Sequence, residues 1–252
     1  MSEPRTEVVR VGHAQITCAW WGSGPTRVVM LHDGLGSIGQ WRDVPARIAD
    51  RLGVAVMAYA RPGHGASTPV PTGPWPAAWL HREARRLGEL LGVLGIEQPL
   101  LVGHSDGGSI SLMHAAAGGA ASGVVALAPH SWVEEVCRQN IAAMRENPQP
   151  ILWGLARHHE NPEAVFEAWS GVWVSDEFSR WDIRPRLGEI DVPTLVVQGV
   201  DDAYATDAQL HLTVEAIGEH GAGRLVPDVG HLLHHDDPDL VVDVVADFFA
   251  GV

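Results

Sequence analysis

Two kinds of apolar pattern alternate along the chain. Short blocks are apolar almost throughout, whereas longer blocks repeat apolar residues at every third or fourth position. The first pattern is typical of strands buried on both faces, and the second is typical of amphipathic helices. Strands are therefore predicted at 7–11, 14–21, 27–32, 54–59, 99–103, 124–128, 194–199 and 223–227. Helices are predicted at 41–52, 77–94, 108–117, 208–217 and 238–249.

The order of these elements predicts the class of fold. Gly12 and His13 separate the first two strands, which favours a hairpin. Further along, strands alternate with helices, and this order is typical of a mostly parallel sheet with helices on both faces. Asp237 can cap the last helix, and Pro238 fits its first turn. We therefore predict an α/β fold.

The stretch 130–189 interrupts the alternation of strands and helices. It is helix-like, and a structureless loop of that length is uncommon inside a compact domain. We predict that it forms a helical lid inserted into a single α/β domain. That domain would comprise residues 1–129 and 190–252.

The predicted lid is rich in tryptophan. Trp169 and Trp173 fall on one face of a helix, because residues four positions apart are neighbours on a helix surface. Together with His130 and Trp132 they are predicted to line a pocket for an apolar or aromatic substrate. The tryptophans of this stretch are Trp132, Trp153, Trp169, Trp173 and Trp181.

The composition narrows the range of partners. The formal net charge is -14 with histidine neutral, and such a surface repels nucleic acid and anionic membranes. No apolar run approaches the length of a membrane span, and residues 1–10 lack the apolar core of a signal peptide. Cys18 and Cys137 form neither a disulfide framework nor a metal-binding spacing. We expect a cytoplasmic enzyme that acts on a small molecule.

A glycine-rich motif marks the predicted nucleophile. Residues 100–108 read LLVGHSDGG and contain G-x-S-x-G with Ser105 at its centre. An apolar strand precedes the motif and a helix follows it, and in that context the motif carries a reactive serine. The flanking glycines leave room for a sharp, strained turn that exposes the hydroxyl at the end of the sheet. We predict that Ser105 is a nucleophile.

A serine hydroxyl needs a base within hydrogen-bonding reach, and His231 has the best position among the 14 histidines. It follows a late strand on a turn that contains glycine, just before the final helix. This places it at the sheet edge where Ser105 is expected. His234 and His235 lie nearer the start of the last helix, and we assign them to a polar helix entrance.

A carboxylate is expected to orient the histidine. Residues 196–202 read VVQGVDD, which is a buried strand followed by a glycine and two acids. The resulting chain order of serine, acid and histidine is that of one known type of triad. A buried carboxylate is costly unless it is paired. One of Asp201 and Asp202 is therefore expected to face His231, while the other meets solvent.

Five short segments carry a resemblance to a known family. They are HDGLGS at 32–37, RPGHGAS at 61–67, GHSDGG at 103–108, PTLVVQGVDD at 193–202 and GHLLHHDDP at 230–238. With these segments in this order, the chain resembles the α/β-hydrolase superfamily, in the lid-bearing branch of small esterases, lactonases and carbon–carbon bond hydrolases. The resemblance covers nearly the whole chain and implies the α/β-hydrolase fold.

The resemblance also implies roles for individual residues. Its pattern of glycine, two residues and aspartate after the seventh strand selects Asp202 as the triad acid. Its His-Gly-x segment after the third strand implies that Gly34 supplies one oxyanion N–H, and Asp106 after the nucleophile supplies the second. In some relatives the acid follows the sixth strand instead, where Glu134 and Glu135 lie.

Two positions depart from the family pattern. Asp33 stands where the family usually has glycine, and a carboxylate near a developing oxyanion is unfavourable by Coulomb's law. Asp33 is therefore expected to point away or to be neutralised, or else the oxyanion donors lie elsewhere. Ala60 replaces the acid that often precedes the R-P-G-H-G segment, and nothing in the sequence explains this change.

These residues together predict acyl transfer to water, with a carboxylic ester or lactone as substrate. The same triad serves carbon–carbon bond hydrolases and serine acyltransferases or cyclases, and a ligand-binding protein without turnover is an alternative of another class. No cofactor is predicted, because the glycine-rich segment 34–39 lacks the ending of a phosphate loop. His158, His159 and Glu160 are adjacent and point different ways, so no metal site is predicted.

Overall fold

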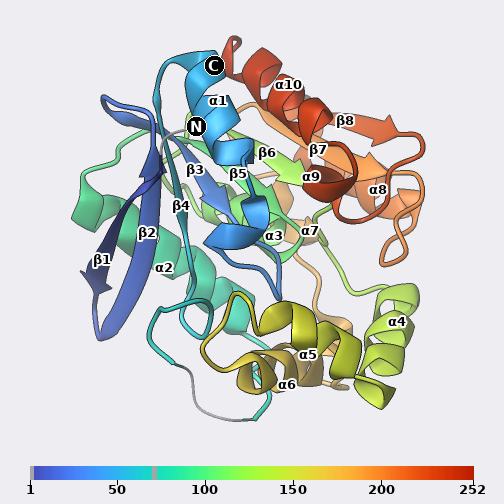
Figure 1. The fold of residues 1–252 in the computed structure, drawn as a ribbon. Helices are drawn as coiled ribbons and strands as arrows, with labels where there is room; N and C mark the ends of the chain where they lie inside the picture. Colours follow the sequence, from blue (N-terminus) through green and yellow to red (C-terminus); the bar gives the residue numbers. More distant parts are fainter. Residues whose placement is uncertain (1–2, 70–72) are drawn as a thin grey trace.

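The fold is built around one sheet of eight strands, in the order β1-β2-β4-β3-β5-β6-β7-β8 (Figure 1). The computed structural model describes residues 3–69 and 73–252. The strands are β1 (Arg5–Val11), β2 (Ala14–Trp21), β3 (Thr26–Leu31), β4 (Ala55–Tyr59), β5 (Leu100–His104), β6 (Gly123–Leu127), β7 (Thr194–Gly199) and β8 (Gly221–Val226).

The sheet is antiparallel at one edge and parallel elsewhere. β1 pairs with β2, and β2 with β4, in antiparallel register, so the predicted hairpin is confirmed. All neighbours from β4 through β8 pair in parallel. The prediction of a mostly parallel sheet is therefore confirmed. Because parallel strands end at the same edge, the loops that follow β3, β5, β7 and β8 meet there.

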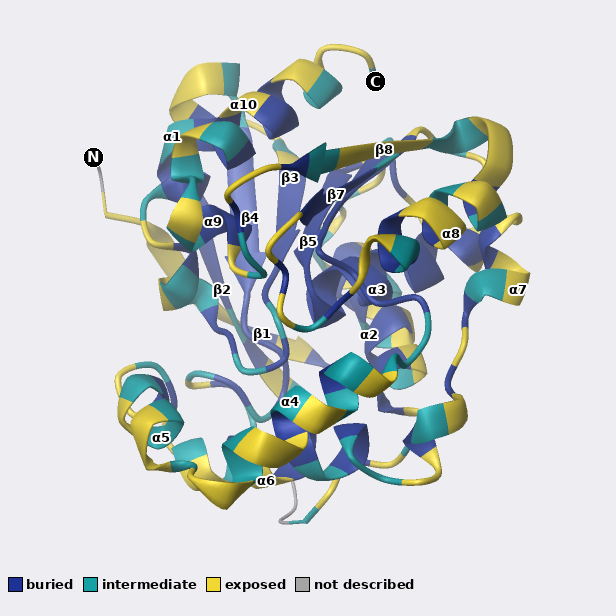
Figure 2. Cartoon of the chain, turned by 90° about the vertical axis from the view of Figure 1, so that its right-hand side faces the viewer, coloured by how far each residue is buried: buried dark blue, intermediate teal, exposed yellow. Residues whose placement is uncertain are grey.

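Helices cover both faces of the sheet, as predicted (Figures 1 and 2). Val28 and Met30 of β3 pack into one core, whereas Val29 and Leu31 pack into the other. The first core is covered by α1 and α10, and the second by α2, α3 and α8. These helices are α1 (Val44–Leu52), α2 (Trp79–Leu94), α3 (Asp106–Ala116), α8 (Asp207–Ile217) and α10 (Pro238–Phe249).

The predicted helix at 41–52 is divided in the structure. A 3-10 turn, η1 (Ile38–Trp41), comes first, and α1 begins only at Val44. Arg42 lies between them with a φ of 53°, which no right-handed helix accommodates. The predicted start at Trp41 was wrong. Trp41 is buried like the apolar residues of the helix and so continues their spacing, but it belongs to the preceding 3-10 turn.

The segment 130–189 contains α4 (Glu135–Glu146), α5 (Gln149–Leu155), α6 (Pro162–Trp173), η2 (Phe178–Arg180) and α7 (Arg184–Leu187). Figure 1 shows α4, α5 and α6 gathered at one end of the molecule, whereas α7 packs against α3 and α8. Two further short helices, η3 (Gly218–His220) and α9 (Leu233–Asp236), flank β8. Within residues 3–69 and 73–252, no helix combines the length and apolar character that crossing a bilayer demands.

The predicted cap of the last helix provides a test of local stability. Asp237 Oδ1 accepts a hydrogen bond from Leu240 N–H at 2.9 Å. We expect Asp237→Ala to lower the free energy of unfolding by about 1 kcal/mol, because it leaves a helix-terminal N–H without its partner. Chemical denaturation measures this loss. Asp243→Ala, at an exposed position of the same helix, is the matched control, and an equal loss in both variants would contradict the capping role.

Candidate active site

The site begins at the sharp turn between β5 and α3. Ser105 has a φ of 51° and a ψ of -118°, which is a strained backbone for a residue with a side chain. A Cβ added to Gly103 would overlap the backbone of Gly107, and one added to Gly107 would overlap the backbone of Leu31. The two glycines of the motif are therefore required by close contact between α3 and strands β5 and β3. Figure 2 shows α3 buried along its length.

The structure brings together the three residues predicted as a triad. Ser105 Oγ lies 3.0 Å from His231 Nε2. On the other side of the ring, His231 Nδ1 lies 3.0 Å and 2.9 Å from the two carboxylate oxygens of Asp202. The three side chains come from the ends of β5, β8 and β7. A proton can therefore pass from the hydroxyl to a ring that the carboxylate holds in place.

Asp202 is the aspartate that faces the histidine. Asp202 is buried, whereas Asp201 is exposed. This agrees with the expectation that one aspartate faces His231 and the other meets solvent. Burial of Asp202 opposes its ionisation, but hydrogen bonds from His231 and from Tyr204 N–H (2.8 Å) outweigh this cost. These hydrogen bonds hold the pKa of Asp202 below its ordinary value, so the carboxylate stays charged.

The alternative acids after the sixth strand have other partners. Glu134 accepts hydrogen bonds from the N–H and the hydroxyl of Thr206, at 3.2 Å and 2.6 Å. Glu135 lies within 3.4 Å of Arg138 on α4. His231 is bonded to Asp202 instead, so the structure favours the end of β7 as the source of the acid.

Gly34 lies directly against the turn that carries the serine. A Cβ at this position would overlap both Trp169 Nε1 and Asp106 Oδ2, which are joined by a hydrogen bond of 2.8 Å. The buried Arg61 holds the two residues that precede Gly34. Its guanidinium donates to the carbonyl oxygens of His32 and Asp33, each at 2.5 Å. Gly34 is thus in close contact with the side chains of Trp169 and Asp106.

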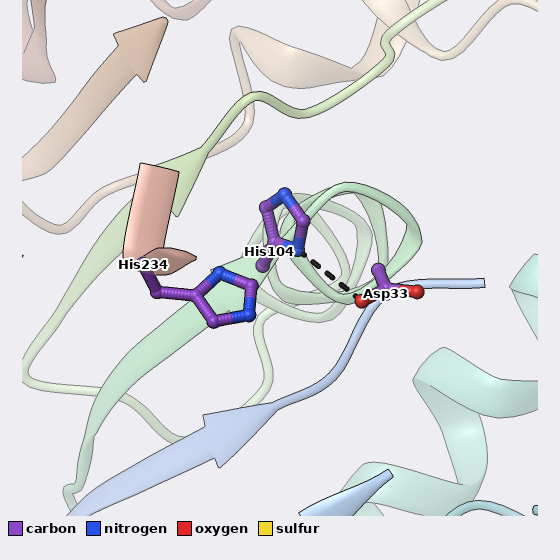
Figure 3. A group of neighbouring side chains, drawn as sticks. All are labelled: Asp33, His104 and His234. Carbon is purple, nitrogen blue, oxygen red and sulfur yellow. Dashed lines mark ion pairs between the residues drawn. The ribbon is translucent and has the colours of Figure 1, made fainter. Parts of the chain in front are cut away.

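Asp33 points away from this contact and toward His104, as Figure 3 shows. Asp33 Oδ1 accepts a hydrogen bond from Leu35 N–H at 2.9 Å, and Oδ2 lies 3.5 Å from His104 Nδ1. Burial opposes ionisation of this carboxyl, but His104 and the neighbouring His32 favour it and hold its pKa well below the ordinary range. The departure from the family pattern at Asp33 therefore supplies a hydrogen-bonding partner inside the loop.

His104 connects this aspartate to the backbone of the predicted base. Its Nε2 donates to the carbonyl oxygen of His231 at 2.8 Å. Asp33, His104 and His234 also bring one nitrogen or oxygen each within 4.8 Å of one another, and these are donor types that Zn²⁺ accepts (Figure 3). Trp41 fills the space beside them, which is too small to hold a water molecule. The group is thus a packed polar cluster without an open coordination position.

A cavity of about 480 Å³ opens above Ser105. Its volume is typical of sites for small molecules. His130, Trp169 and Trp173 line it, as predicted. Trp132 does not, because its ring lies under the guanidinium of Arg184, 4.2 Å away. The remaining apolar lining comes from α4 and α5 and from the strand ends, namely Leu35, Cys137, Ile141, Met144, Pro150, Ile151, Leu155, Tyr204 and Leu232.

The side chain of Asp106 is a part of the site that sequence reasoning missed. The motif assigned a role only to its N–H, yet its carboxyl is buried beside Gly34. Burial raises the pKa of Asp106 to about 7, although the charge of Arg61 and the hydrogen bond from Trp169 oppose this shift. The acidic residue at the second x of the G-x-S-x-G motif was the only signal in the sequence.

Matches to known proteins identify the family of this chain. The profile of the family described as "Alpha/beta hydrolase family" matches residues 28–244. The chain therefore belongs to the alpha/beta hydrolase family. This assignment confirms the resemblance that the five sequence segments carry, and it agrees with the sheet and helices described above.

Individual relatives span nearly the whole chain. The 2-succinyl-6-hydroxy-2,4-cyclohexadiene-1-carboxylate synthase of Serratia proteamaculans (strain 568) is 26% identical, over 89% of this chain and 93% of that protein. The structure of E-2-(acetamidomethylene)succinate hydrolase has a TM-score of 0.78 at 19% identity, and covers 98% of this chain and 99% of its own. Est816, described as an N-acyl homoserine lactone degrading enzyme, has a TM-score of 0.75 at 24% identity, with 96% and 100% covered.

The buried Asp106 predicts how stability depends on pH. Its pKa is about 7 in the folded protein and 3.8 ordinarily, so the folded state binds more protons than the unfolded state between these values. Asp106 therefore makes the free energy of unfolding fall as pH rises through this window. We expect Asp106→Asn to remove that contribution, so that the variant becomes relatively more stable at neutral pH.

Denaturation of both proteins at a series of pH values measures the effect. Asp201→Asn is the control, because this aspartate is exposed and lies one residue from Asp202. A difference between wild type and Asp106→Asn that stays constant from acid to neutral pH would contradict the buried, protonated carboxyl.

Proposed function

We propose that this protein is a serine hydrolase that cleaves a carboxylic ester or lactone through an acyl-enzyme. The observation that carries the proposal is the unbroken series of contacts from Ser105 through His231 to Asp202 at the floor of an apolar cavity. Three side chains from three separate strand ends meet in the arrangement that activates a serine hydroxyl. Membership of the hydrolase family supports the general class of reaction.

In the proposed mechanism, His231 Nε2 takes the hydroxyl proton as Ser105 Oγ attacks the substrate carbonyl. The imidazolium then donates this proton to the leaving alcohol, and the acyl group stays on Ser105. A water molecule enters, and His231 takes one of its protons as the oxygen attacks the acyl carbonyl. The bond to Ser105 Oγ then breaks, His231 returns the proton to Oγ, and the carboxylic acid leaves. Asp202 remains charged throughout and fixes the tautomer of the ring.

The negative charge on the attacked carbonyl oxygen needs hydrogen-bond donors. We assign this role to the N–H groups of Gly34 and Asp106, because a serine at such a turn directs the following N–H toward the reacting carbonyl. The hydrogen bonds from Arg61 hold the Gly34 segment in place before substrate binds. Donors that are fixed in advance cost no reorganisation during the reaction.

We assign the role of a lid to the segment 130–189. Its helices supply most of the apolar lining, including Trp169 and Trp173. His159 attaches this segment to the core, since its ring nitrogens lie 2.9 Å from Leu35 O and 3.0 Å from Gly65 N. A lid of this kind excludes water and favours an apolar or aromatic substrate.

One relative favours a second candidate function. The protein from Serratia proteamaculans is named a synthase, and its product is a cyclohexadiene carboxylate. That name is not one of an ester hydrolase, so cleavage of a carbon–carbon bond by the same three residues is the second candidate for this chain. Assay of a vinylogous 1,5-diketone beside an ester panel separates the two reactions, because only carbon–carbon chemistry consumes the diketone.

Substitution of the proposed triad tests the hydrolase function. We expect Ser105→Ala to lower kcat for 4-nitrophenyl esters by about a thousandfold or more, because it removes the nucleophile. We expect Asp202→Asn to lower it by about a hundredfold or more, because the wrong tautomer of His231 is favoured. Circular dichroism checks that each variant is folded.

Asp201→Asn is the matched control for Asp202→Asn, since the two aspartates are adjacent and only one faces the histidine. Its activity is expected to stay near that of the wild type. A folded Ser105→Ala protein with wild-type ester turnover would refute the proposed function. A loss in Glu134→Gln that exceeds the loss in Asp202→Asn would move the acid to the sixth strand.

Asp106 predicts the pH dependence of the reaction. Its carboxyl is neutral below its pKa of about 7 and charged above it. Because a charged carboxylate beside Gly34 disfavours the oxyanion, we expect kcat/KM to fall as pH rises above about 7. In Asp106→Asn this fall is expected to be absent. A wild-type profile without the fall, or a variant profile that retains it, would count against the prediction.

A further inference from the structure

The cavity above Ser105 has a basic rim in an acidic protein. The chain carries a formal net charge of -14, with 31 acidic residues and 17 arginines and no lysine. Yet the cavity is lined by four basic side chains at its exposed end, Arg42, Arg157, His158 and His235, which we call the basic rim. Its deep end is formed by buried apolar residues such as Ile141 and Trp173. The cavity is thus polar and basic at one end and apolar at the other.

The four basic side chains gather on one wall, around the η1 turn. His235 Nε2 donates to the carbonyl oxygen of Gln40 at 3.0 Å. His158 lies against Gly39, where an added Cβ would come within 3.0 Å of its Nδ1. Arg42 follows the turn directly. Arg157 precedes His158 in the chain, and both line the cavity. Burial, and to a smaller extent the charge of Arg157, lower the pKa of His158.

The two arginines of this rim make no ion pair in the part of the chain that the structure describes. Among residues 3–69 and 73–252, no carboxylate lies within 4.0 Å of the guanidinium of Arg42 or Arg157. Asp33 is the one acid that lines the cavity in those ranges, and its carboxylate is bound to Leu35 N–H and faces His104. The two guanidinium groups are therefore available to a ligand.

The backbone of Arg42 is strained to hold this position. Its φ of 53° and ψ of -123° nearly equal those of Ser105, at 51° and -118°. Residues with a Cβ adopt such angles only at a cost in free energy, and they cluster at functional sites. Glycine would relieve the strain at position 42, yet the chain has an arginine there.

We propose that the substrate carries a carboxylate at one end of an apolar chain, and that Arg42 and Arg157 bind this carboxylate at the rim while the ester group lies at Ser105. The inference rests on the proposed ester or lactone hydrolysis. The planar guanidinium matches the geometry of a carboxylate and pairs with it through charge-assisted hydrogen bonds. A local positive field also attracts an anion to a protein whose total charge would repel it.

Pairs of esters that differ by one charge test this proposal. Mono-4-nitrophenyl adipate and 4-nitrophenyl hexanoate have acyl chains of the same length, and only the first ends in a carboxylate. The pair 4-carboxyphenyl hexanoate and phenyl hexanoate places the same difference on the alcohol. We expect kcat/KM to favour the charged member of at least one pair, mainly through a lower KM. The preference is expected to weaken with added salt, which screens exposed charges.

The decisive variant is Arg42→Gln combined with Arg157→Gln. We expect the charged-to-neutral ratio of kcat/KM to fall about tenfold or more, as the loss of charge-assisted hydrogen bonds implies. Arg51→Gln is the matched control, because it removes an exposed arginine of α1 that lies outside the cavity. Its ratio is expected to equal that of the wild type. A wild type that discriminates in neither pair, or a double variant that keeps the discrimination, would overturn the proposal.

A binding measurement separates this inference from the proposed function. Ser105→Ala protein is titrated with monomethyl adipate and with methyl hexanoate, and quenching of tryptophan fluorescence reports on Trp169 and Trp173 in the cavity. We expect the charged ester to bind more tightly than the neutral one, and this difference to disappear when Arg42→Gln and Arg157→Gln are added. That result would support the anion site even if no ester is turned over. Equal affinity for the two ligands, or no binding of the charged one, would overturn it.

Discussion

The arrangement of the site depends on the close approach of α3 to strands β3 and β5. Backbone atoms of Leu31, Gly103 and Gly107 pack so tightly that a single added carbon would not fit. This contact forces the turn at Ser105, and the turn is held by a hydrogen bond of 2.8 Å from Ser105 N–H to the carbonyl of Leu127 on β6. The hydroxyl is thereby fixed to three adjacent strands. The loops after β3, β7 and β8 reach it because parallel strands end together.

The sequence predicted features that repeat or that follow from local chemistry. Strands buried on both faces are apolar throughout, so their ends were placed within two residues of those observed. The Ser105 turn, His231 and Asp202 follow from short segments at strand ends. The break in the helix at 41–52 was not predicted, because the buried Trp41 satisfies the helical spacing from outside the helix.

Long-range contacts between side chains could not be read from the sequence. The chain separates Trp169 from Asp106 by 63 positions and His104 from His231 by 127. Neither hydrogen bond leaves a local pattern. The same reason explains why a carboxylate at position 33 looked unfavourable beside the oxyanion segment. Only in the folded chain does His104 lie 3.5 Å from that carboxylate. The pocket residues Trp169 and Trp173, which share a helix face, were predicted correctly. The prediction for Trp132 was wrong, because its ring packs under Arg184.

The hydrogen bond from His104 holds the main chain of residue 231 and makes no use of its side chain. The loop after β8 is therefore anchored by a group that every amino acid possesses. Replacement of the histidine by another residue would remove the imidazole and leave this anchor intact. The position of the loop therefore does not depend on the imidazole that acts as the base. A variant with another residue at position 231 should keep the loop in place without cleaving substrate, and is therefore suitable for crystallising uncleaved ligands.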